Sequence, residues 1–253
     1  MTEVASDQAI KIFSDGGSRA EGAASACLFY ASDSALPIKI GAYLGNATNN
    51  EAEIIAALLG FALRPLLEPA SPTVFWTSDS EYVLKSATQY IHTWQKNGWK
   101  TADKRKVKNL GLWRVYLELA RGVEIKSKFV YGHSGHDENE VCDSFCSFLI
   151  QNPPSDKQVY FTDGLSLDPW YVVDLRDELE FLRQNEEGAV EAKDQILAKI
   201  SNTVSSGNKV DQDQQLLREA QGAVLKVLDR FKKYPDSHQQ LHQFLQQVRE
   251  TLK

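Results

Sequence analysis

Apolar residues form short runs and periodic stretches along the first 150 residues of the chain. Ala9–Phe13, Ala23–Tyr30 and Ile38–Leu44 are apolar runs of strand length, with turn residues between the last two. From Asn49 to about Leu63, apolar residues recur at steps of three and four, the period of an amphipathic helix. The pattern therefore predicts three consecutive antiparallel strands followed by a helix.

The pattern of the next 90 residues alternates between helix and strand. It predicts strands at Val74–Thr77 and Glu124–Tyr131 and helices at Tyr82–Ala87, Tyr90–Lys96, Leu110–Ala120 and Glu138–Ile150. This order of elements is typical of an α/β layer fold, with a mixed five-stranded sheet flanked by helices.

The periodicity breaks at Asn152-Pro153-Pro154, because paired prolines cannot continue a helix. We therefore expect a first domain over residues 1–152, a linker with short strand segments over 153–174, and a mainly helical accessory domain over 175–253. Apolar residues repeat at helical spacing over Leu217–Phe231 and again over Leu241–Leu252. These stripes suggest helices that pack on one another, mediate a homodimer or bind a protein partner.

Composition narrows the classes of function. The chain is 42% hydrophobic and 25% charged, as in an ordinary globular protein, and its net charge of −6 argues against a general nucleic-acid coat protein. No apolar run reaches about 18 residues, so no membrane partner is expected. Three cysteines are too few for an oxidised scaffold, which favours a cytoplasmic location.

Charge is distributed unevenly along the chain. Residues 81–110, here called the basic segment, carry seven basic and two acidic residues, whereas residues 151–253 carry 13 basic and 17 acidic residues. Lysine and arginine can neutralise phosphates, and the tryptophans of the basic segment can pack on sugars or bases. The basic segment is therefore a candidate nucleic-acid-binding surface, and the alternative is a solvated charged face, which most charge runs of this kind form.

Four acidic residues occur at the ends of predicted elements: Asp15, Glu53, Asp79 and Asp143. If the first and fourth strands are neighbours, Asp15 and Asp79 lie together and a packed helix can bring Glu53 beside them. Carboxylates crowded in this way repel one another unless a divalent cation compensates their charge. Two-metal phosphoryl chemistry requires such a cluster.

The first domain resembles the type 1 ribonucleases H over about residues 9–150. The motifs that carry the resemblance occur in family order and are Ser14-Asp15-Gly16, Thr48-Asn49-Asn50 with Glu53, Thr77-Ser78-Asp79-Ser80, Trp94 to Lys100, and Gly132-His133 to Asp143. The resemblance implies a ribonuclease H-like sheet and a metal-dependent endonuclease that cuts the RNA strand of RNA/DNA hybrids, leaving 5′-phosphate and 3′-hydroxyl ends.

The resemblance also implies roles for particular residues. Two Mg²⁺ ions, or Mn²⁺, would be held by Asp15, Glu53, Asp79 and Asp143, with Glu140 nearby and His133 assisting proton transfer or product release. The residues implied in hybrid binding are Asn49, Asn50, Trp94, Lys96, Trp99, Lys100, Lys104, Arg105, Lys106 and Lys108. The segment after Asp15, Gly16 to Gly22, is shorter than in many relatives, which leaves its contacts to 2′-hydroxyl groups open.

Two other functions remain open. A 3′–5′ exonuclease of related fold usually has a second carboxylate two residues after the first, and Gly17 occupies that position. A hybrid-binding or scaffold protein on a retired nuclease fold would not need the four carboxylates and His133. A zinc site at His133, His136, Cys142 and Cys146 is disfavoured by their spacing, and Cys142 and Cys146 are expected to be reduced residues on a helix face.

Overall fold

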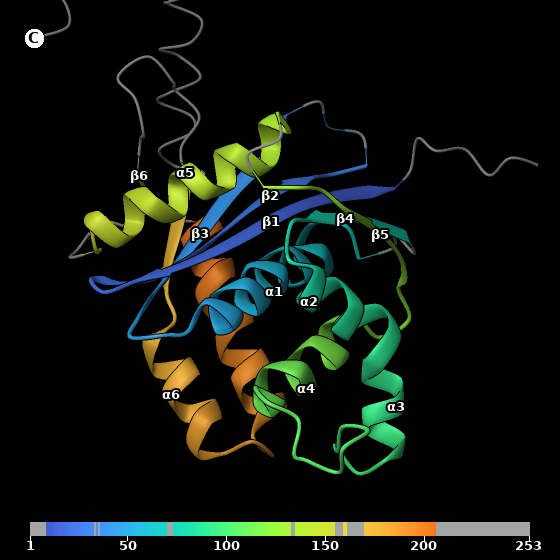
Figure 1. The fold of residues 1–253 in the computed structure, drawn as a ribbon. Coiled ribbons are helices and arrows are strands. Elements are labelled where there is room, and N and C mark those ends of the chain that lie inside the picture. Colours follow the sequence, from blue (N-terminus) through green and yellow to red (C-terminus); the bar gives the residue numbers. More distant parts are fainter. Residues whose placement is uncertain are drawn as a thin grey trace, which may run out of the picture. The chain divides into compact units, whose positions relative to one another are not determined.

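A seven-stranded sheet forms the centre of the molecule, with helices on both of its faces (Figure 1). The structure, a computed structural model, describes residues 9–32, 34, 36–69, 73–132, 135–154, 159–160 and 170–205. β2 (Gly22–Tyr30) runs antiparallel to both β1 (Ile10–Arg19) and β3 (Ile38–Gly45). The predicted order of three antiparallel strands is confirmed.

β4 (Thr73–Ser78) lies parallel to β1 on the side away from β2, and β5 (Glu124–Phe129) lies parallel to β4 at the edge of the sheet. Phe13 is the register partner of Thr77. Asp15 and Asp79 each lie two residues beyond this pair, which places them side by side where β4 ends. β1 itself continues past Asp15 to Arg19, so the first strand is longer than the predicted Ala9–Phe13.

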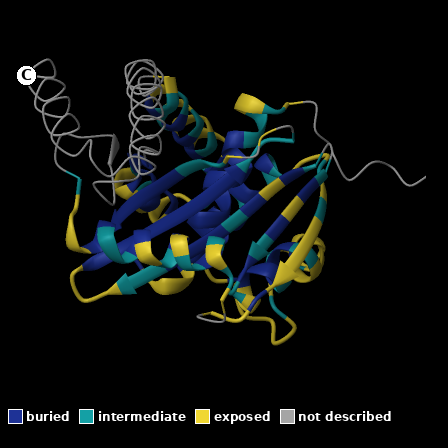
Figure 2. Cartoon of the chain, turned by 90° about the horizontal axis from the view of Figure 1, so that it is seen from above, coloured by how far each residue is buried: buried dark blue, intermediate teal, exposed yellow. Residues whose placement is uncertain are grey.

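The helices form a thick layer on one face and a thin layer on the other. The first face carries α1 (Asn49–Leu67), α2 (Glu81–Lys85), the π-helical turn η2 (Ser86–Tyr90), α3 (Ile91–Lys96) and α4 (Leu110–Leu119). The second face is covered by α5 (Asp137–Gln151). Figure 2 shows the central strands buried between these layers, whereas β5 is largely exposed. The mixed α/β fold with flanking helices is therefore confirmed, but the sheet has seven strands and not the predicted five, because the chain after α5 adds two.

The chain after α5 continues the same sheet, which differs from the predicted domain boundary. β7 (Trp170–Asp174) runs parallel to β3, and β6 (Val159–Tyr160) pairs with β7. α6 (Arg176–Gln184) and a helix over residues 189–205 follow on the face of α1. We call residues 170–205 the extension.

The chain divides into compact units after Ser205, not after residue 152. The prolines end α5, but β7 is apolar on both sides: Trp170 packs with Phe145 of α5, whereas Val173 joins the core on the opposite face. A strand buried on both faces belongs to the sheet and cannot act as a linker. The apolar stripes of residues 217–252 lie outside the described residues. In the described part of the chain, no helix has the length and apolar character needed to span a membrane.

Candidate active site

The site is built first on β1. Ser14 and Asp15 are buried residues in the middle of β1, beside the point where β4 ends, and the Ser14 hydroxyl accepts a hydrogen bond of 2.8 Å from Nε1 of Trp76 on β4. The backbone N–H of Gly16 donates to Oδ1 of Asp15 over 2.8 Å. These bonds fix β1 at Ser14–Gly16 and set the direction of the Asp15 carboxylate.

Glycine at position 16 allows α1 to approach β1 closely. A Cβ atom there would lie 2.3 Å from the carbonyl carbon of Ala52 and from the backbone nitrogen of Glu53. No side chain fits at these distances, so the helix backbone can rest on the strand only where glycine stands. The close approach brings Glu53 next to Asp15.

Thr48 caps α1 in a reciprocal capping box with Glu51, which fixes where the helix begins. Glu53 then lies at the inner face of the helix. One carboxylate oxygen from each of Asp15, Glu53 and Asp79 lies within 4.8 Å of the other two. The three carboxylates come from β1, α1 and the end of β4, as the sequence predicted from strand neighbourhood.

Burial and mutual repulsion raise the pKa of two of these groups. Burial is the largest cause for Asp15, followed by the charges of Asp79 and Asp143, and together they raise its pKa to about 7. Burial and the charges of Asp15 and Asp79 raise the pKa of Glu53 well above its ordinary value. The protein thus holds negative charge where it is unfavourable unless a cation is present.

Asp143 of α5 completes the site. It lines the same cavity of about 270 Å³ as Asp15, Glu53, Asp79 and Glu140. Asp143 lies outside the group of three carboxylates within 4.8 Å, but its charge reaches Asp15. The cavity therefore has carboxylates on three sides.

The donor set fits divalent cations. Oε2 of Glu53 is buried and accepts no hydrogen bond within the described residues. A buried carboxylate oxygen without a donor is unfavourable, and a hard cation that prefers oxygen ligands would satisfy it.

His133 lies outside the described residues, but both ends of its loop are described. A Cβ atom on Gly132 would lie 2.8 Å from Oδ2 of Asp79, so the loop starts against that carboxylate. Oε1 of Glu140 accepts a hydrogen bond of 2.9 Å from the backbone of Gly135, which ties the other end to α5. Glu140 therefore anchors the loop at the rim of the cavity.

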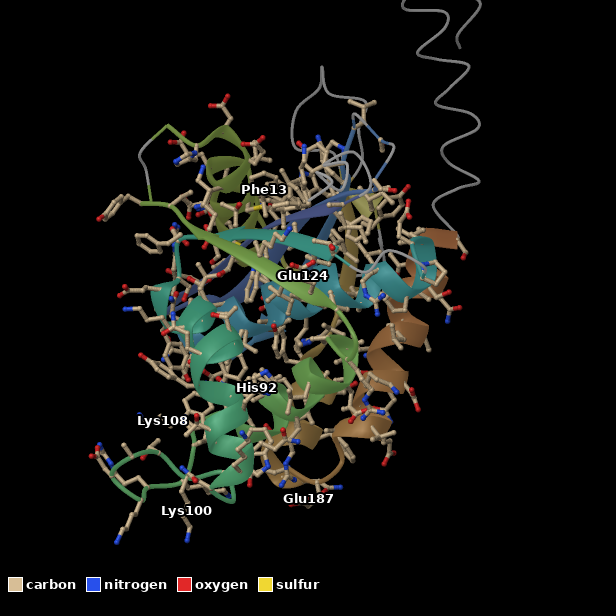
Figure 3. The ribbon with its side chains drawn as sticks, turned by 90° about the vertical axis from the view of Figure 1, so that its right-hand side faces the viewer. Phe13, His92, Lys100, Lys108, Glu124 and Glu187 are labelled. Atoms are coloured by element: carbon tan, nitrogen blue, oxygen red, sulfur yellow. The ribbon has the colours of Figure 1, made fainter. Side chains whose placement is uncertain are left out.

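The basic segment presents its cations to solvent at a distance from the sheet (Figure 3). The exposed cations are Lys96, Lys100, Lys104, Arg105, Lys106 and Lys108. Two of them have acidic partners: Arg105 with Asp103 at 2.8 Å, and Lys106 with Glu186 of the extension.

The two tryptophans of the basic segment are partly buried, and their contact with the hybrid stays a prediction. Trp94 and Trp99 pack against the core. Trp94 meets Trp113 edge to face at 6.1 Å, and the Arg114 guanidinium lies 5.4 Å from the Trp99 ring. Both rings bury apolar area against α4, and this packing stabilises the base of the segment.

Asn49 lines the cavity, whereas Asn50, also exposed, does not belong to its lining.

The structure adds residues that the sequence analysis missed. Arg19 lines the cavity and donates to Oγ of Ser147 over 2.7 Å, and the buried Oδ1 of Asn139 has no donor among the described residues. Only the position of Arg19 at the end of β1 could have indicated it.

Cys142 and Cys146 are buried, reduced residues on the sheet-facing side of α5, as predicted. Their thiols lie 3.6 Å from the carbonyl oxygen of Phe13 and 3.3 Å from that of Asp15, respectively. They pack α5 onto β1.

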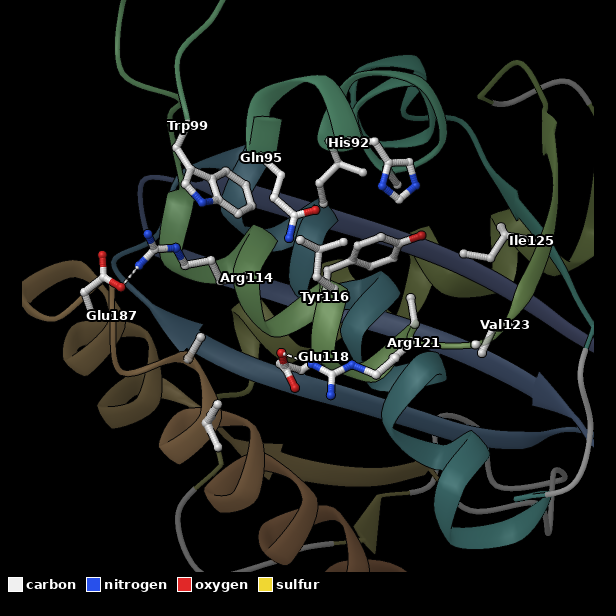
Figure 4. A pocket seen from close by; sticks show the side chains of 17 residues that line it. His92, Gln95, Trp99, Arg114, Tyr116, Glu118, Arg121, Val123, Ile125 and Glu187 are labelled. Carbon is white, nitrogen blue, oxygen red and sulfur yellow. Dashed lines mark hydrogen bonds and ion pairs between the residues drawn. The ribbon is translucent and has the colours of Figure 1, made fainter. Parts of the chain in front are cut away.

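A larger cavity of about 580 Å³ lies between α3, α4, β5 and the turn before residue 189 (Figure 4). Its arginines already have partners: Arg114 lies 2.5 Å from Glu187, and Arg121 lies 2.6 Å from Glu118. It has no cluster of carboxylates, so the smaller cavity is the candidate active site.

The chain matches the family model of RNase H over residues 7–149. It is 42% identical over 113 residues to ribonuclease H of Vibrio campbellii, covering 45% of this chain and 71% of that protein. Ribonuclease H of Aliivibrio salmonicida is 43% identical over 113 residues, covering 45% of this chain and 69% of that protein. LC9-RNase H1, a type 1 RNase H with the type 2 active-site motif, superposes with a TM-score of 0.48 at 21% identity, covering 59% of this chain and 75% of that chain.

Proposed function

The chain belongs to the ribonuclease H family, the metal-dependent enzymes that hydrolyse RNA in RNA/DNA hybrids, and we propose that Asp15, Glu53, Asp79 and Asp143 form its catalytic centre with two divalent cations. The observation that carries this proposal is the group of three carboxylates within 4.8 Å, with an oxygen of Glu53 left buried and unpartnered. Mg²⁺ is the expected ion, with Mn²⁺ as a substitute.

When bound, the two cations supply Lewis-acid chemistry: they withdraw charge from the scissile phosphate and favour ionisation of the attacking water. The reaction leaves 5′-phosphate and 3′-hydroxyl ends. Asp15 and Glu53 are held rigidly by the middle of β1 and the start of α1, so the protein positions its charges before the substrate arrives. His133 is proposed to move a proton or to assist product release, in a loop that Glu140 anchors.

Substrate binding is assigned to the cavity rim and the basic segment. Asn49 and Arg19 lie at the rim, where the amide and the guanidinium can contact backbone phosphate or a 2′-hydroxyl. Lys96, Lys100, Lys104, Lys106, Lys108 and Arg105 neutralise phosphates of the hybrid farther away. Little preference for base sequence is expected.

A cleavage assay with the full-length chain and a 5′-labelled RNA/DNA hybrid tests the proposal. Wild-type protein with Mg²⁺ should cut the RNA strand, and Asp79→Asn should lower kcat by more than about 100-fold, since it removes a metal ligand. Asp194→Asn, a change to an exposed carboxylate of the extension that lies outside the cavity lining and the basic segment, is the matched control. An uncut hybrid, or cleavage that survives Asp79→Asn, would refute the assignment.

The substrate design separates the remaining alternatives. An RNA segment with DNA on both ends of its strand should be cut internally by an endonuclease, whereas a 3′–5′ exonuclease must start at the DNA terminus. Gly17 favours the first outcome, because glycine supplies no carboxylate at the position two residues after Asp15 where such an exonuclease usually has one. A retired scaffold would bind the hybrid and leave it intact.

A further inference from the structure

The extension reaches the start of α1 through one side chain, Arg183 of α6. Its Nε donates to Oε1 of Glu51 and its Nη2 to Oε2, each over 2.9 Å. Nη2 also donates to the backbone carbonyl of Asn46 over 3.0 Å. A two-pronged contact of this kind fixes the orientation of a carboxylate better than a single ion pair does.

Glu51 is the centre of the capping box. Its Oε2 accepts from the backbone N–H of Thr48 over 2.8 Å and from the Thr48 hydroxyl over 2.9 Å. The Glu51 side chain is 8% exposed and that of Arg183 is 36% exposed. Burial alone would raise the pKa of Glu51, but hydrogen bonds from Arg183 and Thr48 outweigh it and lower the pKa. Hydrogen bonds from Thr48 and from Arg183 thus hold the carboxylate between the two elements.

The segment held in this way carries active-site residues. Asn49 at the rim of the cavity is two residues before Glu51, and Glu53 is two residues after it. The loop before α1 is tied from the other side too, because the Ser18 hydroxyl donates to the carbonyl oxygen of Ala47 over 2.6 Å. Arg183 is not part of the cavity lining, so it acts on the site only through α1 and its loop.

We propose that Arg183 is a positioning residue for the active site, which through Glu51 and Asn46 fixes the first turn of α1 and so holds Glu53 among the metal-binding carboxylates. The inference rests on the proposed function, since it assigns to Glu53 the role of a metal ligand. It gives the extension a part in catalysis although the described extension contributes no lining residue to the cavity.

Arg183→Met in the full-length chain tests the proposal, because methionine keeps much of the side-chain length and removes every donor. Two quantities are measured below the melting temperature: the affinity of substrate-free protein for Mn²⁺, by titration calorimetry, and kcat and KM for a labelled hybrid. Mn²⁺ affinity and kcat should each fall by about 10-fold, the usual effect of losing a group that orients a ligand. KM should change by less than kcat, because Asn49 at the cavity rim is affected but the lysines of the basic segment are untouched.

Lys199→Met is the matched control. Lys199 donates to Glu178 over 2.7 Å and to the carbonyl of Asp174 over 2.8 Å, contacts that lie wholly within the extension. Its loss should lower the melting temperature and leave Mn²⁺ affinity and kcat unchanged. If Arg183→Met behaves like Lys199→Met in both measurements, Arg183 is only a stabilising residue and the proposal is wrong.

Two conservative variants keep the test decisive if Arg183→Met does not fold. Arg183→Lys should retain an intermediate Mn²⁺ affinity and kcat, and Glu51→Gln, which keeps an acceptor for Thr48, should shift both in the same direction by less. Wild-type values from both variants would overturn the proposal. A wild-type protein that binds Mn²⁺ but leaves the hybrid intact would refute the proposed function instead, and the Mn²⁺ titrations would still test Arg183.

Discussion

At the scale of single residues, Asp15 and Glu53 store unfavourable electrostatic energy in the metal-free protein. Both are buried, and their pKa values are raised by burial and by neighbouring carboxylates. In the unfolded chain these side chains ionise freely in water. Metal binding and folding are therefore coupled through the same carboxylates.

The first prediction is a fall in the stability of metal-free protein as the pH rises from about 4 to about 7. Between the ordinary pKa of Asp15, 3.8, and its folded value of about 7, the folded state binds more protons than the unfolded state, so the free energy of unfolding decreases with rising pH. Each pKa unit corresponds to about 1.4 kcal/mol. Asp15→Asn should flatten this slope, as measured by urea unfolding in chelator at several pH values.

The matched variant is Asp103→Asn, an exposed carboxylate that should leave the slope unchanged. Saturating Mg²⁺ should restore stability at pH 7 in the wild type and much less in Asp15→Asn, since a ligand that binds only the folded state stabilises it. A wild-type slope that matches that of Asp15→Asn would contradict the pKa assignment.

The site residues that lie in a local sequence motif were predictable. Residues that act through a partner far away in the sequence were not. Asp15 follows the apolar run Ala9–Phe13 and Asp79 follows the run Val74–Thr77, so the sequence places them together once these two strands are taken as neighbours. Arg183 lies in an ordinary amphipathic helix, and its partner Glu51 is 132 positions earlier in the sequence. Trp94 and Trp99 were assigned to the substrate because sequence shows that a tryptophan is near lysines but not which way its ring points.

At the scale of elements, the contact between β1 and α1 depends on Gly16. The second prediction is that Gly16→Ala destabilises the fold by at least about 1–3 kcal/mol, the usual effect of overpacking, because its Cβ would meet backbone atoms that cannot rotate away. Gly17→Ala is the control: its Cβ would lie 3.6 Å from Cβ of Cys146, an ordinary contact. Urea unfolding of both variants measures the difference, and equal stabilities would show that α1 can move off β1 freely.

The third prediction concerns the basic segment as an electrostatic element. Lys100→Gln or Lys108→Gln should raise KM for the hybrid, leave kcat unchanged, and reduce the slope of log affinity against log salt by about one. Lys106→Gln should have a smaller effect, because Glu186 already neutralises that lysine. Lys128→Gln on the exposed edge strand β5 is the control. Equal effects of Lys100→Gln and Lys128→Gln on KM would show that the basic segment is not part of the hybrid-binding surface.

Secondary structure was predicted well where the apolar periodicity extends over many residues. It was predicted poorly where contacts with other elements determine the structure. The three N-terminal strands and α1 follow from their patterns. The π-helical turn between α2 and α3 has no sequence signal of its own, because it differs from an α-helix only in which carbonyl each N–H meets. β7 was recognised as a strand, but its place beside β3 depends on long-range pairing.

At the scale of the whole molecule, the paired prolines were the strongest break in the sequence but do not mark the boundary of the compact unit. A break in a helix is local, whereas a domain boundary depends on which surfaces are buried. Trp170, Leu179, Leu182 and Ile196 of the extension are buried against both faces of the sheet and its helices. The extension is therefore part of the core of the ribonuclease H unit in this chain.

The role of the last 48 residues stays a prediction. If they mediate a homodimer, the full chain should have twice the mass of its monomer in light scattering, and a chain ending at Ser205 should be monomeric. If both chains are monomeric, the last 48 residues do not mediate a homodimer.

The last prediction compares chains that end at Ser205 and at Pro154. The longer chain keeps all described elements and should melt cooperatively and cut the hybrid with the kcat of full-length protein. The shorter chain exposes the core surface under β7, α6 and the helix over residues 189–205, and each fully exposed large apolar side chain costs about 1.5–3 kcal/mol. A few such residues exceed the roughly 5–15 kcal/mol by which a folded domain is usually stable.

The shorter chain should therefore lose its cooperative melting transition in circular dichroism. Saturating Mg²⁺ would restore little of it, because metal stabilises only folded molecules whose start of α1 is in place, and that chain also lacks Arg183. A chain ending at Pro154 that melts and cuts like the full-length protein would show that residues 1–154 fold alone. It would also show that the extension belongs to a separate accessory domain, as the sequence predicted.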